Sequence, residues 1–507
     1  MGARRVVRWL AAGAALLFCG HRLVGTLDVV RESSAGYSYV RAWRSIASAA
    51  GASSPALLCE DASSPAPVER TRLIALAWER PAGIPHAVDR RAGLAGEVCV
   101  FTSRWVSAQD ERWLASAGFV CAATNDYACA WRPAGPDKGA VPQGGEEKVP
   151  GRVRESLSLV LLATLLLMLW RAATKGDGRE IPRGAGWVAL GLFALLCAVV
   201  LQHPLLPPNG LGTYGGKAKL LWHCGGFPGG YWDADGFGVL QPAYPPGLTI
   251  LALAHFLLSG GCGDRLVQVL LPLGLTLLFL ELAKGGRRLA EVMPFVLYLV
   301  SPVAIRLASG FYAEPFAALA LLAGWNAMRR GRFAFGAVVM GCAGLFRLEA
   351  GVAAVVFAFV QGLAAKRGGV SQALCLGLAA APVLCWMVPC RLMGCWISDW
   401  DFARMPDFVL TAHAVVCEAE AMLCCVLPVA ALIRCAAGND AGSCAGARRW
   451  AFGAFGLFLL AMPLACGFYA SRHGVWMVDN TIPRLVWYLA IIPLASLCET
   501  DKKSFSR

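Results

Sequence analysis

Charged residues are scarce in this chain. Only 16% of its 507 residues are Asp, Glu, Lys or Arg, whereas a soluble domain carries about 25%. Hydrophobic residues make up 57%, the mean hydropathy is +0.55, and apolar runs of roughly 17 to 25 residues recur along the sequence. The composition excludes an ordinary soluble protein and predicts one that crosses a membrane several times. The net charge of +13 does not indicate nucleic-acid binding, because most of the excess Lys and Arg lies in short loops, where it sets membrane orientation.

Metal-binding and nucleotide-binding motifs are also missing. The 20 cysteines include no Cys-x-x-Cys pair, so no zinc motif is present, and most of them lie in apolar runs as small hydrophobic residues. Nothing in the polar N-terminal stretch resembles a nucleotide-binding loop. If that stretch faces an oxidising compartment, its four cysteines allow one or two disulfides. These are Cys59, Cys99, Cys121 and Cys129.

The chain divides into three parts. Residues 1–29 have a basic start and a modest apolar core, typical of a signal anchor or a cleaved signal peptide, and we favour the anchor. Residues 30–153 contain no span and predict a small extracytoplasmic α/β domain. Residues 154–507 predict a multi-spanning membrane domain. Within the α/β domain, the predicted helices are 38–51 and 108–118, and the predicted strands are 72–78, 97–103 and 119–131.

The fold class that follows is an all-α polytopic membrane protein with about twelve transmembrane helices, the anchor included. The other predicted spans are 156–172, 185–203, 265–283, 289–308, 313–329, 331–347, 349–365, 371–390, 408–433, 451–470 and 482–498.

Segment 244–260 decides the topology, because its length is close to the minimum for a span. If it lies along the outer face without crossing, the basic loops that follow it all stay on the cytoplasmic side, as the positive-inside rule requires. We therefore predict that it does not cross. The outer face then carries the α/β domain, the long loop 203–264 and three shorter loops.

Several residues at this face have side chains suited to chemistry. Carboxylates can accept a proton from a hydroxyl or bind a cation, and Lys and Arg can hold a phosphate. Ionisable groups at span ends are costly in lipid and so point to function. The candidates are Asn209, Tyr214, Lys217, Lys219, Trp232, Asp233, Asp235, Tyr244, Glu314, Arg347, Arg404 and Arg484.

Each candidate also has a structural interpretation. The aromatic residues fit an interfacial belt, and the two lysines fit the anchor of an interfacial helix. Asp233 and Asp235 form an Asp-x-Asp pair that suits a divalent cation, an acceptor hydroxyl or a solvated turn. Glu314 precedes a proline and is also a good helix start. Arg347 can pair with nearby Glu349.

The order of these elements resembles the GT-C superfamily of membrane glycosyltransferases, especially the protein-mannosyltransferase and lipid A aminoarabinose transferase type. The matching segments are YGGKAKLLW at 214–222, AYPPGLTIL at 243–251, SPVAIRLASGFYAEPFAAL at 301–319 and WNAMRRGRFAFGAVVMGCAGLFRLEAG at 325–351. The resemblance covers roughly residues 185–390.

The resemblance implies a GT-C-like core and an inverting transfer of a sugar from a polyprenyl-phosphate donor at the outer face. An acid of the first outer loop would activate the acceptor hydroxyl, and basic residues would hold the lipid phosphate. Similar proteins usually have Asp where this chain has Asn209. An amide cannot act as a base, so either Asp233 or Asp235 takes that role, or the enzyme is inactive or altered in its chemistry.

The expected partners are the lipid-linked donor, membrane lipids and a lipid, glycan or protein acceptor. No cofactor is expected beyond a divalent cation at the Asp-x-Asp pair. The expected location is a bacterial inner membrane with the active face in the periplasm. Two other functions stay open: a transporter or flippase, and a lipid-glycan ligase or polymerase. The polar residues gather at one face and the two halves show no repeat, which favours the transferase over a transporter.

Overall fold

The structure is a computed structural model, and it describes most of the membrane part and pieces of the N-terminal part. The described residues are 13, 20, 24, 43, 56–58, 86–88, 99–103, 108–124, 128–134, 156–164, 166–167, 181–202, 213–227, 243–261, 266–286, 288–365, 368–394, 405–437, 445–468 and 474–498.

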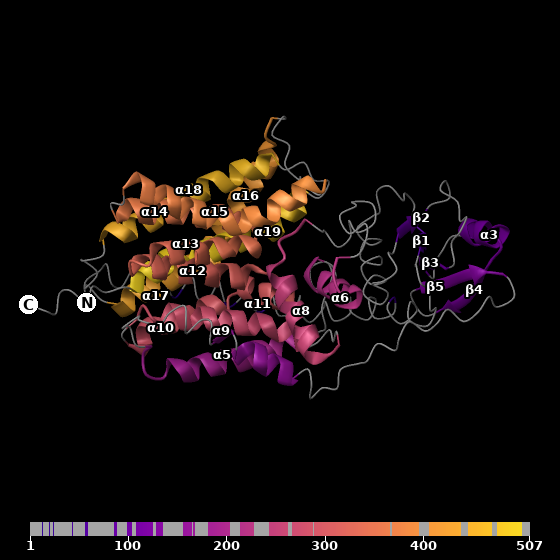
Figure 1. Cartoon of the computed structure of the whole chain (residues 1–507), viewed down its shortest axis with the longest axis horizontal. Helices are drawn as coiled ribbons and strands as arrows, with labels where there is room; N and C mark the ends of the chain where they lie inside the picture. Colours follow the sequence, from indigo (N-terminus) through magenta and orange to yellow (C-terminus); the bar gives the residue numbers. More distant parts are fainter. Residues whose placement is uncertain are drawn as a thin grey trace, which may run out of the picture.

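The membrane part is a bundle of helices (Figure 1). In chain order the helices are α5 (Ala185–Val200), α6 (Gly215–Cys224), α8 (Gly247–Ser259), α9 (Leu270–Ala283), α10 (Leu289–Leu299), α11 (Pro302–Ser309), α12 (Glu314–Arg329), α13 (Phe333–Gly341), α14 (Leu348–Ala364), α15 (Gly369–Leu392), α16 (Phe408–Ala421), α17 (Leu427–Ala437), α18 (Ala445–Gly467), α19 (Gly474–Leu489) and α20 (Ile491–Cys498). Three short turns extend α9, α13 and α16: η3 (Leu266–Val269), η4 (Cys342–Leu345) and the π turn η5 (Met422–Val426).

Among the described residues, five helical stretches are long and apolar enough to cross a membrane. The bent pair α10 and α11, with an angle of 58° between its halves, makes a sixth if it is counted as one span. The chain is therefore a helical membrane protein. Other predicted spans appear as shorter apolar helices, such as α5 and α14, and the count of twelve stays a prediction. The five are Leu266–Ala283, Gly369–Leu392, Phe408–Ile433, Arg449–Gly467 and Val478–Leu497.

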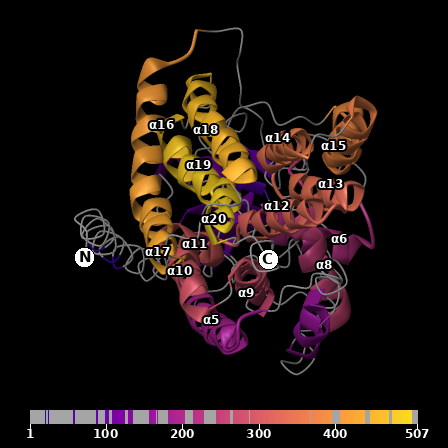
Figure 2. The same ribbon diagram turned by 90° about the vertical axis from the view of Figure 1, so that its left-hand side faces the viewer.

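Helix α12 lies near the centre of the bundle (Figure 2). It contacts α9, α13, α14, α19 and α20. Glycines let α12 and α13 approach closely: a Cβ on Gly324 would lie 2.6 Å from the Gly336 carbonyl, and one on Gly336 would lie 2.7 Å from the Gly324 carbonyl. Small residues commonly give close helix packing in membranes. This packing fixes the position of α12, and with it Glu314 in the first turn and Asn326 near the last turn.

Helix α8 matches the segment whose topology was in question. It has 13 residues and is therefore about 20 Å long, shorter than a hydrocarbon core of about 30 Å. Its first residue approaches the turn before α14 closely, since a Cβ on Gly247 would lie 2.7 Å from the Leu345 carbonyl oxygen. This contact brings the end of the long outer loop to the start of α14. That the segment lies on the outer face stays a prediction.

A five-stranded sheet lies beyond α6 (Figure 1). The elements of this unit are β1 (Ala56–Leu58), β2 (His86–Val88), β3 (Val100–Ser103), α3 (Ala108–Ser116), β4 (Phe119–Thr124) and β5 (Ala128–Pro133). The strand order is β2-β1-β3-β5-β4; β1 is parallel to β2 and β3, while β5 is antiparallel to β3 and β4. A small core joins the sheet to α3, and it consists of Val100, Leu114, Phe119, Cys129 and Trp131.

The sequence predicted part of this unit. The helix at 108–118 is confirmed, and strands form in 97–103 and 119–131. Strands β1 and β2 were not predicted, because three residues are too few to show an alternating pattern. Of the other two predicted elements, 72–78 lies outside the described residues, as does 38–51 apart from Trp43.

The cysteines of the N-terminal part are not paired where the structure describes them. Cys99, Cys121 and Cys129 are free thiols, and Cys59 lies outside the described residues. A disulfide among the three described cysteines is therefore absent. The boundaries of the N-terminal domain at 30 and 153 stay predictions.

Candidate functional site

Glu314 is fully buried at the start of α12. The turn before it is sharply bent, because Phe311 has the left-handed φ of 55° that is unusual for a bulky residue. A Cβ on Gly310 would collide with the Tyr312 ring, so glycine is needed there. Pro315 then occupies the first turn of the helix, where its missing N–H costs nothing. The predicted helix start is thus confirmed, and the turn holds Glu314 inside the protein.

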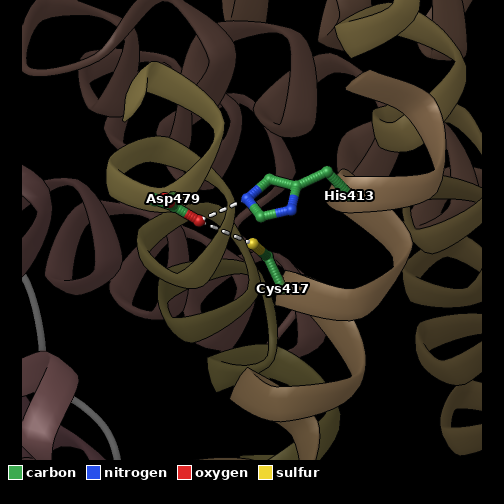
Figure 3. A group of neighbouring side chains, drawn as sticks. All are labelled: His413, Cys417 and Asp479. Atoms are coloured by element: carbon green, nitrogen blue, oxygen red, sulfur yellow. Dashed lines mark hydrogen bonds and ion pairs between the residues drawn. The ribbon is translucent and has the colours of Figure 1, made fainter. Parts of the chain in front are cut away.

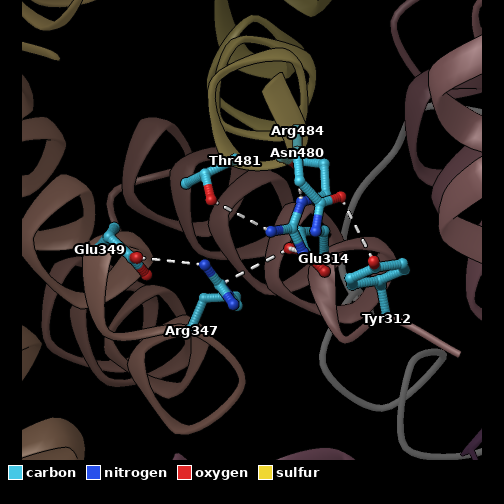
Figure 4. Close-up of polar contacts among 7 residues, drawn as sticks. All are labelled: Tyr312, Glu314, Arg347, Glu349, Asn480, Thr481 and Arg484. Atoms are coloured by element: carbon cyan, nitrogen blue, oxygen red, sulfur yellow. Dashed lines mark hydrogen bonds and ion pairs between the residues drawn. The ribbon is translucent and has the colours of Figure 1, made fainter. Parts of the chain in front are cut away.

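Arg484 of α19 forms the shortest ion pair with this carboxylate (Figure 4). Its Nη1 donates to Oε1 of Glu314 at 3.1 Å. The rest of the guanidinium is held by its own helix: Nε donates to the Asn480 carbonyl and Nη2 donates to the Thr481 hydroxyl at 3.3 Å. The group also stacks over the Tyr312 ring at 4.4 Å. Arg484 is therefore fixed in position from several sides.

Arg347, the residue before α14, approaches the same carboxylate oxygen. Its Nε lies 3.6 Å from Oε1 of Glu314, and its Nη2 donates to Glu349 at 3.1 Å. The predicted pairing of Arg347 with Glu349 is thus confirmed. The Tyr244 ring lies 6.0 Å from the guanidinium. Arg347 is buried, yet its Nε has no hydrogen-bond partner among the described residues.

Other polar atoms in this cluster also lack partners where the structure describes them. They are Oε2 of Glu314 and the Tyr488 hydroxyl, together with the Tyr214 hydroxyl, which lies beside the Arg347 guanidinium without a well-aligned hydrogen bond. Both phenols lie close enough to Arg347 and Glu314 to feel their charges. Burial raises the pKa of Tyr214 above its usual range, so this hydroxyl keeps its proton and can donate. Buried polar groups are usually hydrogen-bonded, and several unpaired ones in one place indicate a ligand-binding site.

Helix α6, which lies in the long segment 203–264, adds a cation beside these residues. Lys217 is buried, and its Nζ donates to the Tyr244 carbonyl at 3.1 Å. Burial lowers the pKa of Lys217 to about 7, so its charge is sensitive to pH near neutrality. Lys219 is buried as well, and burial of both lysines is not what a simple interfacial anchor predicts.

The structure brings together residues from separate parts of the sequence. Of the predicted candidates, Tyr214, Lys217, Tyr244, Glu314, Arg347 and Arg484 are linked through the contacts above. Lys219 lies on the same helix as Lys217, but those contacts do not include it. Five candidates lie outside the described residues: Asn209, Trp232, Asp233, Asp235 and Arg404.

Sequence reasoning missed the residues of α19 that hold Arg484, and it missed Tyr488. Asn480 accepts from the Tyr312 hydroxyl at 3.3 Å through its side chain. The sequence does contain one signal for these residues, because Asn480, Arg484 and Tyr488 lie four residues apart and so share one face of a helix. A polar face in an otherwise apolar span is visible from that spacing alone.

The hydrogen-bond donors of the cluster suit an anion, although Glu314 and Glu349 balance the charges of the two arginines. Two arginines share one oxygen of Glu314, and Glu349 is partly exposed. A guanidinium carries several N–H donors in a planar fork suited to phosphate or carboxylate. Arg347 has unused donor capacity inside the protein, beside a phenol that can also donate. The arrangement can therefore bind an anionic group of a substrate next to a buried carboxylate.

Comparison with known proteins adds no further constraint. No family model matches the chain, and neither a curated protein nor a solved structure matches it.

Proposed function

We propose that this protein is a GT-C-like membrane glycosyltransferase that moves a sugar from a polyprenyl-phosphate donor to an acceptor, with inversion at the anomeric carbon. The reaction takes place at the outer face of the membrane, for which a bacterial inner membrane with a periplasmic active face is the expected setting. The acceptor is a lipid, a glycan or a protein.

One observation carries this proposal. The segments that resemble the superfamily are far apart in the sequence, yet each contributes to the same buried cluster. Tyr214 and Lys217 come from YGGKAKLLW, Glu314 from GFYAEPF and Arg347 from LFRLEAG. A chance resemblance would not require these motifs to meet.

The roles follow from the chemistry of each group. Arg347 and Arg484 bind the phosphate of the donor, and Lys217 adds a positive charge while it is protonated. Glu314 holds both guanidinium groups in place through Oε1 and leaves Oε2 for a substrate hydroxyl. Stabilising the negative charge of the departing phosphate is the main electrostatic contribution to rate.

The acceptor is activated by an acid of the long outer loop. Asp233 or Asp235 takes the proton from the acceptor hydroxyl, whose oxygen forms the new bond to the anomeric carbon. The bond from that carbon to the phosphate oxygen breaks, and polyprenyl phosphate leaves with the electron pair. A divalent cation at the Asp-x-Asp pair would provide further neutralisation of the phosphate. These two residues lie outside the described part of the chain.

The test is release of polyprenyl phosphate by the purified protein in nanodiscs, with a panel of polyprenyl-phosphate sugars. We expect release with one donor, and a fall of at least about 100-fold in Glu314→Gln, because a neutral amide no longer holds the two guanidinium groups that stabilise the departing phosphate. The matched control is Glu281→Gln, which changes another buried carboxylate, on α9, where it accepts a hydrogen bond from Asn326 near the C-terminal end of α12. Its rate per folded molecule stays at the wild-type value.

No release with any donor from folded protein would overturn the proposal. Movement of a labelled lipid-linked sugar across the membrane of proteoliposomes, without release, would indicate a flippase. Joining of two lipid-linked glycans would indicate a ligase or polymerase.

A further inference from the structure

Three side chains with metal-ligating atoms meet between α16 and α19 (Figure 3). Nε2 of His413 lies 2.6 Å from Oδ1 of Asp479, and Sγ of Cys417 lies 3.3 Å from the same oxygen. The three candidate ligand atoms all lie within 4.8 Å of one another. None of the three residues belongs to the cluster around Glu314.

The helices explain why these side chains meet. His413 and Cys417 are four residues apart on α16, which places them on the same face one turn from each other. Helix α19 packs against that face and presents Asp479 to both. Cys417 is buried, whereas the side chains of His413 and Asp479 are 33% and 52% exposed. The group thus lies at the surface of the helix bundle, with the sulfur covered by protein.

The donor set selects the kind of ion. Imidazole nitrogen, thiolate sulfur and carboxylate oxygen together suit Zn²⁺, whereas Mg²⁺ and Ca²⁺ prefer oxygen ligands alone. In a tetrahedral zinc site the ligand atoms lie about 3.4 Å apart, as follows from bonds of about 2.1 Å. The three atoms need to move by only roughly an ångström to reach that arrangement. Three protein ligands also leave a fourth position for water or another ligand.

We propose that His413, Cys417 and Asp479 form a binding site for Zn²⁺ or a similar divalent transition-metal ion, which ties α19 to α16. On binding, the Cys417 thiol gives its proton to solvent, and His413 binds through Nε2 as the neutral tautomer that keeps its proton on Nδ1, so the ligands are the thiolate, the neutral imidazole and the carboxylate. The ion also has a structural consequence. Asp479 directly precedes Asn480, which holds Tyr312 and Arg484, so the metal would fix the first turns of α19.

The experiment uses the full-length protein in detergent, treated with a chelator and kept reduced by a phosphine. Co²⁺ is the probe, because a cobalt–thiolate bond gives a charge-transfer absorption that other ligands do not. We expect one equivalent of Co²⁺ to produce this absorption, and Zn²⁺ to abolish it by displacement. Zn²⁺ should also raise the melting temperature, as any ligand of the native state does.

Variants assign the site. Cys417→Ser removes the charge-transfer absorption, and both Cys417→Ser and His413→Gln weaken Zn²⁺ binding by at least about 100-fold, since even loss of a group that only orients a ligand costs about 10- to 100-fold. The matched control is Cys375→Ser, which changes a buried cysteine on α15. It keeps the charge-transfer absorption and the wild-type affinity for Zn²⁺.

Absence of the absorption in the wild-type protein would overturn the proposal, and it needs no variant to be folded. Unchanged stoichiometry and affinity in Cys417→Ser and His413→Gln would overturn it as well, because the ion would then sit elsewhere. In either case the three residues would be a hydrogen-bonded contact between two helices.

Discussion

Two buried glutamates lie beside opposite ends of α12, and their surroundings differ. Glu314 is in the first turn of α12, whereas Glu281 belongs to α9. Near the last turn of α12, Oε2 of Glu281 accepts from Lys284 at 2.6 Å, while Oε1 accepts from Asn326 at 2.7 Å and lies 4.0 Å from Arg330. Both oxygens are thus paired. At the first turn, Oε1 of Glu314 serves two arginines and Oε2 has no partner among the described residues.

The difference separates a structural role from a binding role. A buried ion pair whose members are all satisfied holds α9 and α12 together and has no capacity for a ligand. Among the described residues, the Glu314 cluster keeps a carboxylate oxygen, the Arg347 Nε and two phenol hydroxyls without a hydrogen bond, at a cost to stability. Groups of this kind are retained where a substrate completes the hydrogen bonds. The four predictions that follow test this contrast.

The largest expected effect comes from the arginines. Arg484→Gln removes the guanidinium closest to Glu314, so transfer measured as kcat/KM should fall by about 100- to 1,000-fold, the usual cost of losing a donor that stabilises developing charge. Arg347→Lys keeps a charge without the planar fork and should recover only part of the rate lost in Arg347→Gln. A rate within about tenfold of wild type in a folded Arg484→Gln protein would remove Arg484 from the site.

The second prediction concerns the other end of α12. Glu281→Gln leaves Lys284 and Arg330 without their buried counter-charge, which costs about 3 to 5 kcal/mol of stability. The denaturation midpoint in detergent should therefore fall, while the rate per folded molecule is unchanged. The contrast between the two glutamates would fail if this variant lost rate but kept its stability.

The third prediction uses the pKa of Lys217, which burial lowers to about 7. If the ammonium helps to bind phosphate, kcat/KM should fall about tenfold per pH unit above that value, and Lys217→Arg should remove the decline. The free energy of unfolding responds to pH in the opposite direction. Between pH 7 and 10.5 the unfolded chain binds a proton at Lys217 that the folded protein does not bind. The contribution of Lys217 to stability therefore rises over that window, and it is lost again as the pH falls from 10.5 to 7. A wild-type profile shared by Lys217→Met would exclude Lys217 from binding.

The smallest effects should come from single hydrogen-bonding groups. Tyr488→Phe removes a hydroxyl that has no partner among the described residues, so stability should stay the same or rise by up to about 1 kcal/mol, while KM for the donor rises a few-fold. Asn326→Leu removes a partner of Glu281 and should destabilise by about 1 to 3 kcal/mol without changing KM. Thermal denaturation measures the stability of the two variants, and donor titration measures their KM. Equal losses of stability in Tyr488→Phe and Asn326→Leu would show that the Glu314 and Glu281 clusters are alike.

Much of the membrane part was predictable from the sequence. Apolar runs marked most of the helices, and the Glu314–Pro315 pair marked the start of α12. Six of the candidate residues lie in one polar cluster. Of the missed residues of α19, Asn480 lies in the predicted loop just before the span 482–498, and Tyr488 was missed because it lies inside that span, where hydropathy averages it into its apolar neighbours. His413 and Cys417 were missed for the same reason.

The sequence by itself determined that this protein is a helical membrane protein, because the length and hydropathy of its apolar runs leave few other ways to satisfy the backbone in lipid. It also determined which types of polar residue stand near the ends of the helices. Only the tertiary structure decided which of them meet. A sequence does not state that Arg484 and Glu314 lie 3.1 Å apart across 170 residues, because such contacts depend on how whole helices pack. The same packing pairs both oxygens of Glu281 and leaves Oε2 of Glu314 without a hydrogen-bond partner among the described residues.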